Sequence, residues 1–406
     1  MPSAEPEIRS GISGLNLSVK KMPRTGCYNL FTAFFRLGLT SFGGPAMVAY
    51  IRELSVVRKK WLDEESFKHG VSLCQAIPGA TAMQMAGYVG LQIRGLKGAF
   101  VSFAGFGLPA FLFMTFLAAL YSRYHILPEV KSIFNGLQVI VTAIVLNATY
   151  SFGKGSVTSI TGLLIVLFSA ALFFAGVTPF LIILMAAFIN IVIDRNRPES
   201  HATSAFEPFN KFQLCKGPLT IFLFGTFFGV LIYFLNTDLF SLAVIMAKID
   251  LFAFGGGFSA LPLMFHEIVT VKAWLSDQTF MDGIALGQVT PGPIVITAAF
   301  VGYLVQGLAG AVTATLAIFT PSFFMLVALA PLYERMKGSP RFLTATQGIL
   351  SSFVGLLIYI SIQFAMLVPW DIIRISTVIA ALIALLGKVD LQYVVLAGAC
   401  ISLFIF

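Results

Sequence analysis

Two basic residues lie inside apolar stretches, each six positions before a glycine-rich break. Arg36 precedes the break at residues 42–45, and Lys248 precedes the break at residues 254–257. A charge at that depth in a membrane is costly unless it is paired or faces water. Arginine offers a two-pronged set of donors to an oxyanion, and lysine offers a compact charge. The spacing therefore favours two cations that converge on one anion, with snorkelling to the membrane surface as the alternative.

Glycines form both breaks. Gly43 and Gly44 lie in the first break, and Gly255, Gly256 and Gly257 lie in the second. Glycine adopts positive φ and leaves backbone N–H groups uncovered, and such groups at helix ends bind anions. Close packing of helices through small residues is the alternative interpretation.

A Pro-Gly pair interrupts the next apolar segment of each half. Pro78 with Gly79, and Pro291 with Gly292, end the preceding helical turn because proline lacks an N–H donor. Unwound backbone at membrane depth persists only where it is buried in protein or lines a water-filled cavity. The pairs are therefore candidates for a substrate site.

Polar side chains accompany the breaks. Gln75 and Gln288 lie three residues before the Pro-Gly pairs, and Ser41 directly precedes the first glycine motif. The amides can donate to a substrate oxygen or satisfy the broken helix itself. Asp250 has only a glycine at the equivalent position of the first half. It either neutralises Lys248 or carries a coupling proton.

These features recur because the chain contains two repeats. The stretch at 61–62 returns at 274–275, and the stretch at 95–99 returns at 307–311, with offsets of 213 and 212 positions. A near-constant offset in a membrane sequence is typical of a transporter built from two structural repeats.

Composition limits the function classes. Of the 406 residues, 58% are hydrophobic and only 11% are charged, which indicates a polytopic helical membrane protein. The net charge of +8 reflects mainly basic cytoplasmic loops, with a share that helps to attract an anion. The basic residues are scattered among apolar segments, so nucleic-acid binding is not expected. The cysteines and histidines form no metal motif, and no ATP-binding motif is visible. The sequence thus predicts no cofactor, no metal and no enzymatic activity.

The apolar segments divide into two sets of six. We expect a disordered cytoplasmic tail at 1–27, a first repeat at 28–193, a linker with one extra transmembrane helix at 194–236, and a second repeat at 237–406. The extra helix would turn the second repeat upside down. The predicted fold is therefore an all-α membrane protein with two inverted repeats. Most loop charges place the N-terminus in the cytoplasm.

One basic loop, at 52–60, does not fit simple crossing. It falls outside the cell if residues 28–50 span the membrane, contrary to the positive-inside rule. Re-entrant hairpins at 28–50 and 68–91 would move this loop inside and place the breaks at hairpin tips. Kinked spanning helices are the alternative, and the sequence leaves both open.

The motifs resemble those of the chromate transporter family. The resemblance covers nearly all of the chain after residue 28 and is carried by the stretches 35–45, 61–62, 74–79, 254–257, 274–275, 288–293 and 307–311. It implies a bidomain inner-membrane protein that expels chromate and confers resistance to it. It also places the family's positively charged first segment at Arg36. Chromate is a tetrahedral dianion like sulfate, and the motifs do not separate the two.

The sequence therefore predicts a secondary active oxyanion transporter, with chromate efflux by alternating access as the main interpretation. The anion would bind near the midplane between Arg36 and Lys248. A transporter of sulfate or another oxyanion, and an anion channel, are the alternatives. The expected partners are the oxyanion and the lipid bilayer. A homodimer, the coupling ion and the direction of transport stay open.

Overall fold

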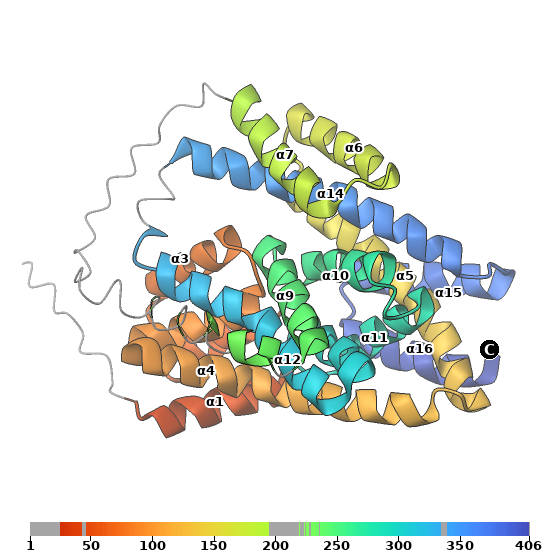
Figure 1. Cartoon of the computed structure of the whole chain (residues 1–406), viewed down its shortest axis with the longest axis horizontal. Coiled ribbons are helices and arrows are strands. Elements are labelled where there is room, and N and C mark those ends of the chain that lie inside the picture. The colour runs from red at the N-terminus through yellow and green to blue at the C-terminus, as the bar shows by residue number, and fades with distance from the viewer. Residues whose placement is uncertain are drawn as a thin grey trace, which may run out of the picture.

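The computed structural model describes residues 25–42, 46–194, 219, 223, 225–226, 229–234, 236–333 and 339–405. Within these ranges every regular element is a helix, as Figure 1 shows. The all-α membrane fold predicted from the sequence is therefore confirmed. Most of the predicted tail at 1–27 lies outside the described residues, and so do 9 of the 20 residues of the extra helix predicted at 217–236. The inversion of the second repeat therefore stays a prediction.

The two repeats contain the same series of helices. The first comprises α1 (Cys27–Thr40), α2 (Ala46–Arg52), the π-helical η1 (Glu53–Arg58), α3 (Glu64–Ala76), α4 (Thr81–Tyr124), α5 (Pro128–Ser156), α6 (Ile160–Phe174) and α7 (Pro179–Ile193). The second comprises α9 (Thr237–Phe252), α10 (Gly257–Phe265), the π-helical η2 (His266–Val271), α11 (Asp277–Val289), the 3-10 turn η3 (Ile294–Ile296), α12 (Thr297–Leu329), α14 (Pro340–Leu367), α15 (Ile372–Leu386) and α16 (Leu391–Ile405).

Equivalent helices begin with similar local chemistry. Asp63 caps α3 and Ser276 caps α11, each side chain accepting from a backbone N–H in the first turn. The longest unbroken helices, α5 and α14, both start with proline, whose fixed φ suits the first helical position. The repeated start signals explain why the helix boundaries match between the halves.

Each of α4 and α12 is a pair of helices folded at a glycine. Gly95 has φ +60° and ψ −148°, and Gly307 has φ +59° and ψ −149°, values that favour glycine strongly. In α4 the Ser102 hydroxyl donates to the Ala86 carbonyl at 2.7 Å. A Cβ on Gly90 would overlap Gly98, and the equivalent glycines of α12 meet in the same way. The arms before and after each glycine therefore run antiparallel in close contact.

The helix before each Pro-Gly break folds back on the arm that follows it. Tyr88, two turns beyond the first break, donates to the Ser66 carbonyl at 3.2 Å and lies against Gly70. In the second repeat Phe300 lies against Gly283. The 13 residues of α3 extend about 20 Å, which is too short for the roughly 30 Å hydrocarbon core. The structure thus contains helical hairpins at both Pro-Gly breaks, as the hairpin hypothesis requires.

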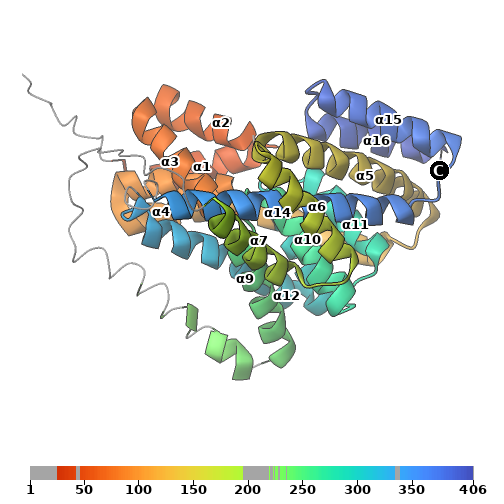
Figure 2. The same cartoon turned by 90° about the horizontal axis from the view of Figure 1, so that it is seen from above.

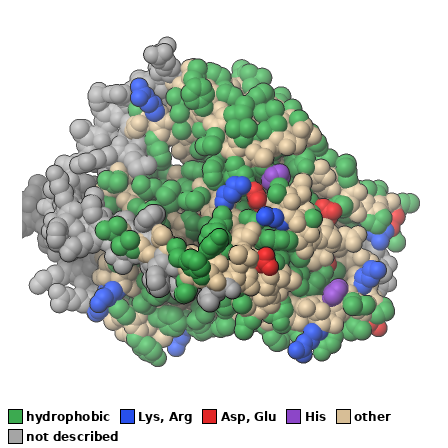
Figure 3. Space-filling view, viewed as in Figure 1, with side chains coloured by type: hydrophobic (Ala, Val, Ile, Leu, Met, Phe, Trp, Pro, Cys, Tyr) green, Lys and Arg blue, Asp and Glu red, His purple; other side chains and the backbone are tan. Residues whose placement is uncertain are grey.

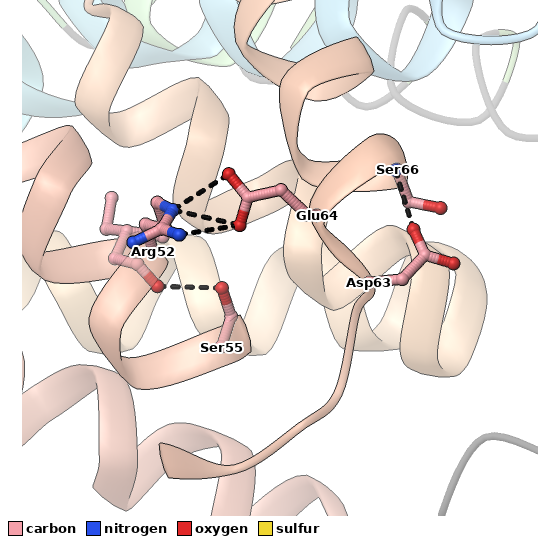
Figure 4. A network of polar contacts seen from close by, with 6 residues as sticks. Arg52, Ser55, Asp63, Glu64 and Ser66 are labelled. Atoms are coloured by element: carbon pink, nitrogen blue, oxygen red, sulfur yellow. Dashed lines mark hydrogen bonds and ion pairs between the residues drawn. The ribbon is translucent and has the colours of Figure 1, made fainter. Parts of the chain in front are cut away.

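The two glycine-motif breaks also reverse the chain. Lys248 on α9 donates to Glu267 on η2 at 2.8 Å, which ties the segments on either side of the break together. In the first repeat the ring of Trp61, after η1, stacks on Phe34 of α1 at 6.3 Å between centroids. Figure 4 shows the loop that follows η1, where Arg52 donates to both carboxylate oxygens of Glu64. This contact lowers the pKa of the Glu64 carboxyl and joins α2 to α3.

The last three helices of each repeat pack against the last three helices of the other repeat. Helices α6 and α7 pack on α14 of the other repeat, and α15 and α16 pack on α5, as Figures 1 and 2 show. Four helices, counted by length and composition in the described ranges, suffice to cross a membrane: Thr81–Tyr124, Pro128–Ser156, Ile294–Leu329 and Pro340–Leu367. The face in Figure 3 is mainly hydrophobic with scattered charges, which suits a lipid-exposed surface.

Candidate functional site

The helix breaks of the two repeats meet through two crossed backbone hydrogen bonds. The Gly79 N–H donates to the Ala253 carbonyl, and the Gly292 N–H donates to the Ser41 carbonyl, each at 2.8 Å. Ala253 and Ser41 occupy equivalent positions directly before the glycine motifs. Each Pro-Gly break therefore contacts the glycine break of the other repeat, and the predicted site residues at these positions converge.

Glycine is required at the crossing points. Gly79 has φ +114° and Gly292 has φ +113°, a region that other residues rarely adopt. A Cβ on Gly79 would overlap the Ser322 hydroxyl, and a Cβ on Gly292 would collide with Ala110. The backbone N–H groups of both glycines are engaged in the crossing bonds, and a side chain at either position would clash.

Asp250 lies beside one crossing and is held by Ser322. Its side chain is buried, and it accepts from the Ser322 N–H at 2.6 Å and from the Ser322 hydroxyl at 2.7 Å. The interpretation that Asp250 neutralises Lys248 is wrong, because Lys248 is paired with Glu267. At the other crossing the equivalent residues are Gly38 and Ala110, which provide no polar side chain. The two crossings differ in charge although their backbones match.

The two predicted cations lie in different environments. Lys248 is half exposed, paired with Glu267 and placed over the Phe180 ring at 3.7 Å. Arg36 is exposed on α1. The structure thus gives Lys248 a local counter-ion that sequence reasoning missed, since Glu267 lies 19 residues away along the chain. Convergence of the two cations on one anion stays a prediction.

Several polar side chains near the breaks are buried. Both side-chain polar atoms of Gln288 and the hydroxyl of Ser41 lack a hydrogen-bond partner among the described residues. Gln75 is instead exposed at the end of α3. Gln84 was not predicted; its amide N–H donates to the Pro78 carbonyl at 2.6 Å, so it satisfies the broken turn. A glutamine inside an apolar segment was the signal for it.

The remaining predicted residues divide into two sets. Gly255 has φ +85° and Gly256 has φ +101°, and Gly257 begins α10. Gly43 and Gly44 lie outside the described residues. Across the described ranges, His, Cys, Asp and Glu side chains form no group of three that could hold a metal ion.

Comparison with known proteins identifies the family. Residues 28–191 and 240–403 each match the description "Chromate transporter". The chain belongs to the chromate transporter family. It is 42% identical to an uncharacterized transporter of Methanocaldococcus jannaschii over 93% of this chain and 94% of that protein. It is 30% identical to a chromate transport protein of Cupriavidus metallidurans over 90% of this chain and 88% of that protein. No solved structure matches the chain.

Membership confirms the resemblance drawn from the motifs and assigns the chain to a family of transporters rather than enzymes. The two matched regions coincide with the two helical series described above. In this chromate transporter family member, a buried amide and a buried hydroxyl without described partners lie next to the crossed breaks. Such neutral donors bind an oxyanion, because they stabilise negative charge without requiring a counter-charge to be desolvated.

Proposed function

We propose that the chain is a secondary active transporter that exports chromate across the inner membrane. The observation that carries the proposal is the crossing of the Pro-Gly and glycine breaks in a chromate transporter family member. Relatives of similar length from Cupriavidus metallidurans and Pseudomonas aeruginosa are named chromate transport proteins. The symmetry-related breaks supply donors from both repeats to one region, which suits a tetrahedral anion.

The proposed site uses the predicted residues in different roles. Gln288 and Ser41 donate to the anion, together with backbone N–H groups of the glycine motifs. Arg36 supplies positive potential at the first glycine break. Lys248 contributes less than expected, because Glu267 already neutralises it. Gly79 and Gly292 keep the crossing free of side chains.

Asp250 is the proposed coupling residue. It is buried, and its described partner is Ser322, a neutral residue, rather than a cation. An ionised carboxylate in such a place is costly in a membrane. Uptake of a proton removes that cost, so protonation and conformation are coupled. At the crossing between Gly292 and Ser41, the position equivalent to Asp250 is Gly38. The proposed coupling therefore uses one crossing and not the other.

The membrane potential favours the proposed direction. A dianion that leaves an inside-negative cell gains about 4.6 kcal/mol per 100 mV. Alternating access through the pseudo-symmetric halves would expose the site to each side in turn. We place the N-terminus in the cytoplasm, because that orientation puts the loop at 52–60 inside when the hairpins are re-entrant.

A counterflow experiment in proteoliposomes tests the function. Vesicles loaded with unlabelled chromate should transiently accumulate radiolabelled chromate, because a carrier exchanges its substrate and a channel does not. Vesicles loaded with unlabelled sulfate and given radiolabelled sulfate test the alternative substrate. Failure of chromate to drive counterflow, with sulfate succeeding, would reassign the substrate. Equilibration without counterflow would indicate a channel.

The site is tested with Gln288→Leu, which keeps the volume and removes both polar atoms. Loss of one hydrogen bond to a charged group is worth about 1.5–3 kcal/mol, or roughly 10- to 100-fold in affinity. We expect that loss in chromate affinity. Ser376→Ala, on the exposed surface of α15, is the control and should match the wild type. Unchanged affinity in Gln288→Leu would remove it from the site.

A further inference from the structure

A cavity of about 250 Å³ lies next to one of the two crossings. It is bordered by the end of α3, the end of α5 and the start of α14. Its lining is mainly apolar, and its polar side chains are Ser156, Thr158, Thr346 and Gln347. Gln347 donates to Thr158 at 2.9 Å, which holds α14 to the loop after α5.

Two residues that line the cavity lie beside the breaks. Ala76, two residues before Pro78, lines it, and so does Leu350. A Cβ on Gly255 would lie 3.2 Å from Leu350 and would overlap the Phe152 ring. The inner end of the cavity therefore adjoins the Pro-Gly break of the first repeat and the glycine break of the second. These two breaks are the ones joined by the bond from Gly79 to Ala253.

The helices around the opposite crossing pack differently. The counterpart of α3 is α11, and α11 packs on both α5 and α16. In the first repeat α3 packs mainly on α4 and borders the cavity instead. The repeats thus match in their helices but differ in how this hairpin meets the helices around it.

A buried polar cluster holds α11 in place. Asp282 on α11 accepts from the Tyr121 hydroxyl of α4 at 2.8 Å and from the Gln138 amide of α5 at 2.9 Å. The Asp282 side chain is only 6% exposed. The cluster therefore joins α11 to two helices of the other repeat.

The bond that Gln138 donates to Asp282 has no counterpart from the equivalent position of the other repeat, which is a leucine. Leu350 stands 212 positions after Gln138 and has no polar group, and it lines the cavity. His69 stands at the position equivalent to Asp282, and its ring meets Tyr333 edge-on at 5.4 Å between centroids. A hydrogen bond like that from Gln138 to Asp282 would tie α3 to α14 and keep the cavity closed. Leu350 on α14 cannot form such a bond.

We infer that the cavity is the open access route to the anion site and that Asp282, Tyr121 and Gln138 latch the symmetry-related route shut on the opposite face. The inference rests on the proposed transport function. Lys154 and Arg341 are exposed and directly precede the lining residues Gly155 and Phe342, so positive charge lies beside the cavity. Positive charge at this place suits capture of an oxyanion from the cytoplasm.

The two routes are distinguished by labelling with a membrane-impermeant maleimide. Ser156→Cys reports on the cavity, and Val368→Cys reports on its equivalent 212 positions later, where Val368 is 4% exposed. Both are made in a chain whose native cysteines are replaced by serine. We expect Ser156→Cys to react and Val368→Cys to be protected. Equal reactivity would overturn the inference.

The latch is then weakened with Gln138→Leu, which copies the residue of the open side, and separately with Tyr121→Phe. Each should raise labelling at Val368→Cys several-fold and lower it at Ser156→Cys, because opening one route closes the other. Ser361→Ala is the control, since it removes a buried bond to Thr149 between α5 and α14. It should change neither site.

Chromate counterflow is measured on the same samples to separate the two claims. Intact counterflow with unchanged labelling in both latch variants would overturn the latch and leave the transport function standing. Labelling that rises at both positions would show general loosening and would also overturn the latch. Absence of counterflow in the wild type would overturn the transport function itself.

Discussion

At the residue scale, the decisive feature is an asymmetry within a symmetric crossing. Both crossings use a backbone bond from a Pro-Gly glycine to the residue before a glycine motif. Only one has a carboxylate beside it, Asp250, held by Ser322. Duplication alone does not produce this difference. We therefore expect the coupling function at the crossing that lies beside Asp250.

Asp250→Asn tests coupling. Asparagine keeps the shape and can still accept from Ser322, but it cannot take up and release a proton. We expect proteoliposomes to lose acceleration of chromate flux by a pH gradient while counterflow persists. Ser322→Ala is the matched variant, because it installs the residue found at the equivalent position. Full pH-driven acceleration in Asp250→Asn would exclude it as the coupling group.

Gly79→Ala tests the geometry of the crossing. Alanine at φ +114° is strained by about 1–3 kcal/mol, and its Cβ would also overlap Ser322. We expect a lower melting temperature in detergent and little chromate flux. Gly153→Ala is the control, because its Cβ would meet only the Val354 side chain at 3.4 Å within the helix α5. Equal melting temperatures for the two variants would show that the crossing is not as described.

At the element scale, the chain folds back on itself at the helix breaks. Four short arms per repeat would be unstable alone in a bilayer, and they are stabilised by contacts with one another. Within α4 and α12, glycines bring the backbones of the two arms into close contact. The sequence already contained the evidence, since small residues recur at matched places in both repeats.

Gly98→Val tests the folded-back arms of α4. A branched side chain at this position would meet the backbone of Gly90 and force the arms apart. Overpacking of this kind costs about 1–3 kcal/mol. We expect lower stability in a thermal unfolding assay. Phe116→Val, on the exposed face of the same helix, should have little effect.

Lys59→Cys tests how the hairpins sit in the membrane. In a cysteine-free background, we expect labelling only from the cytoplasmic side, because both flanking hairpins would return to the side they entered. Labelling only from outside the cell would mean that residues 28–50 span the membrane.

Much of this architecture could be predicted from the sequence. Composition and the repeated motifs gave the membrane class, the two repeats and the positions of the breaks. The partner of Lys248 could not be predicted, because Glu267 approaches it only after the chain reverses at 253–256. The contacts of Gln138 and Tyr121 with Asp282 were missed for the same reason, since they join residues more than 140 positions apart in the chain.

At the scale of the whole molecule, the two repeats contain matching helices. They differ in how α3 and α11 pack on the helices around them. Helices α6 and α7 pack on α14 while α15 and α16 pack on α5, so each repeat is bound to the other. Motion of one hairpin against this frame would open one route and close the other. A symmetric scaffold in an asymmetric state is what an alternating-access transporter requires.

The most direct test of this account is chromate accumulation in proteoliposomes with an imposed membrane potential and pH gradient. Wild-type protein should concentrate radiolabelled chromate above the medium, and the accumulated label should leave when the gradients are dissipated. Gln288→Leu should reduce the initial rate at low chromate by roughly 10-fold or more. Chromate movement no faster than in protein-free vesicles would contradict the account.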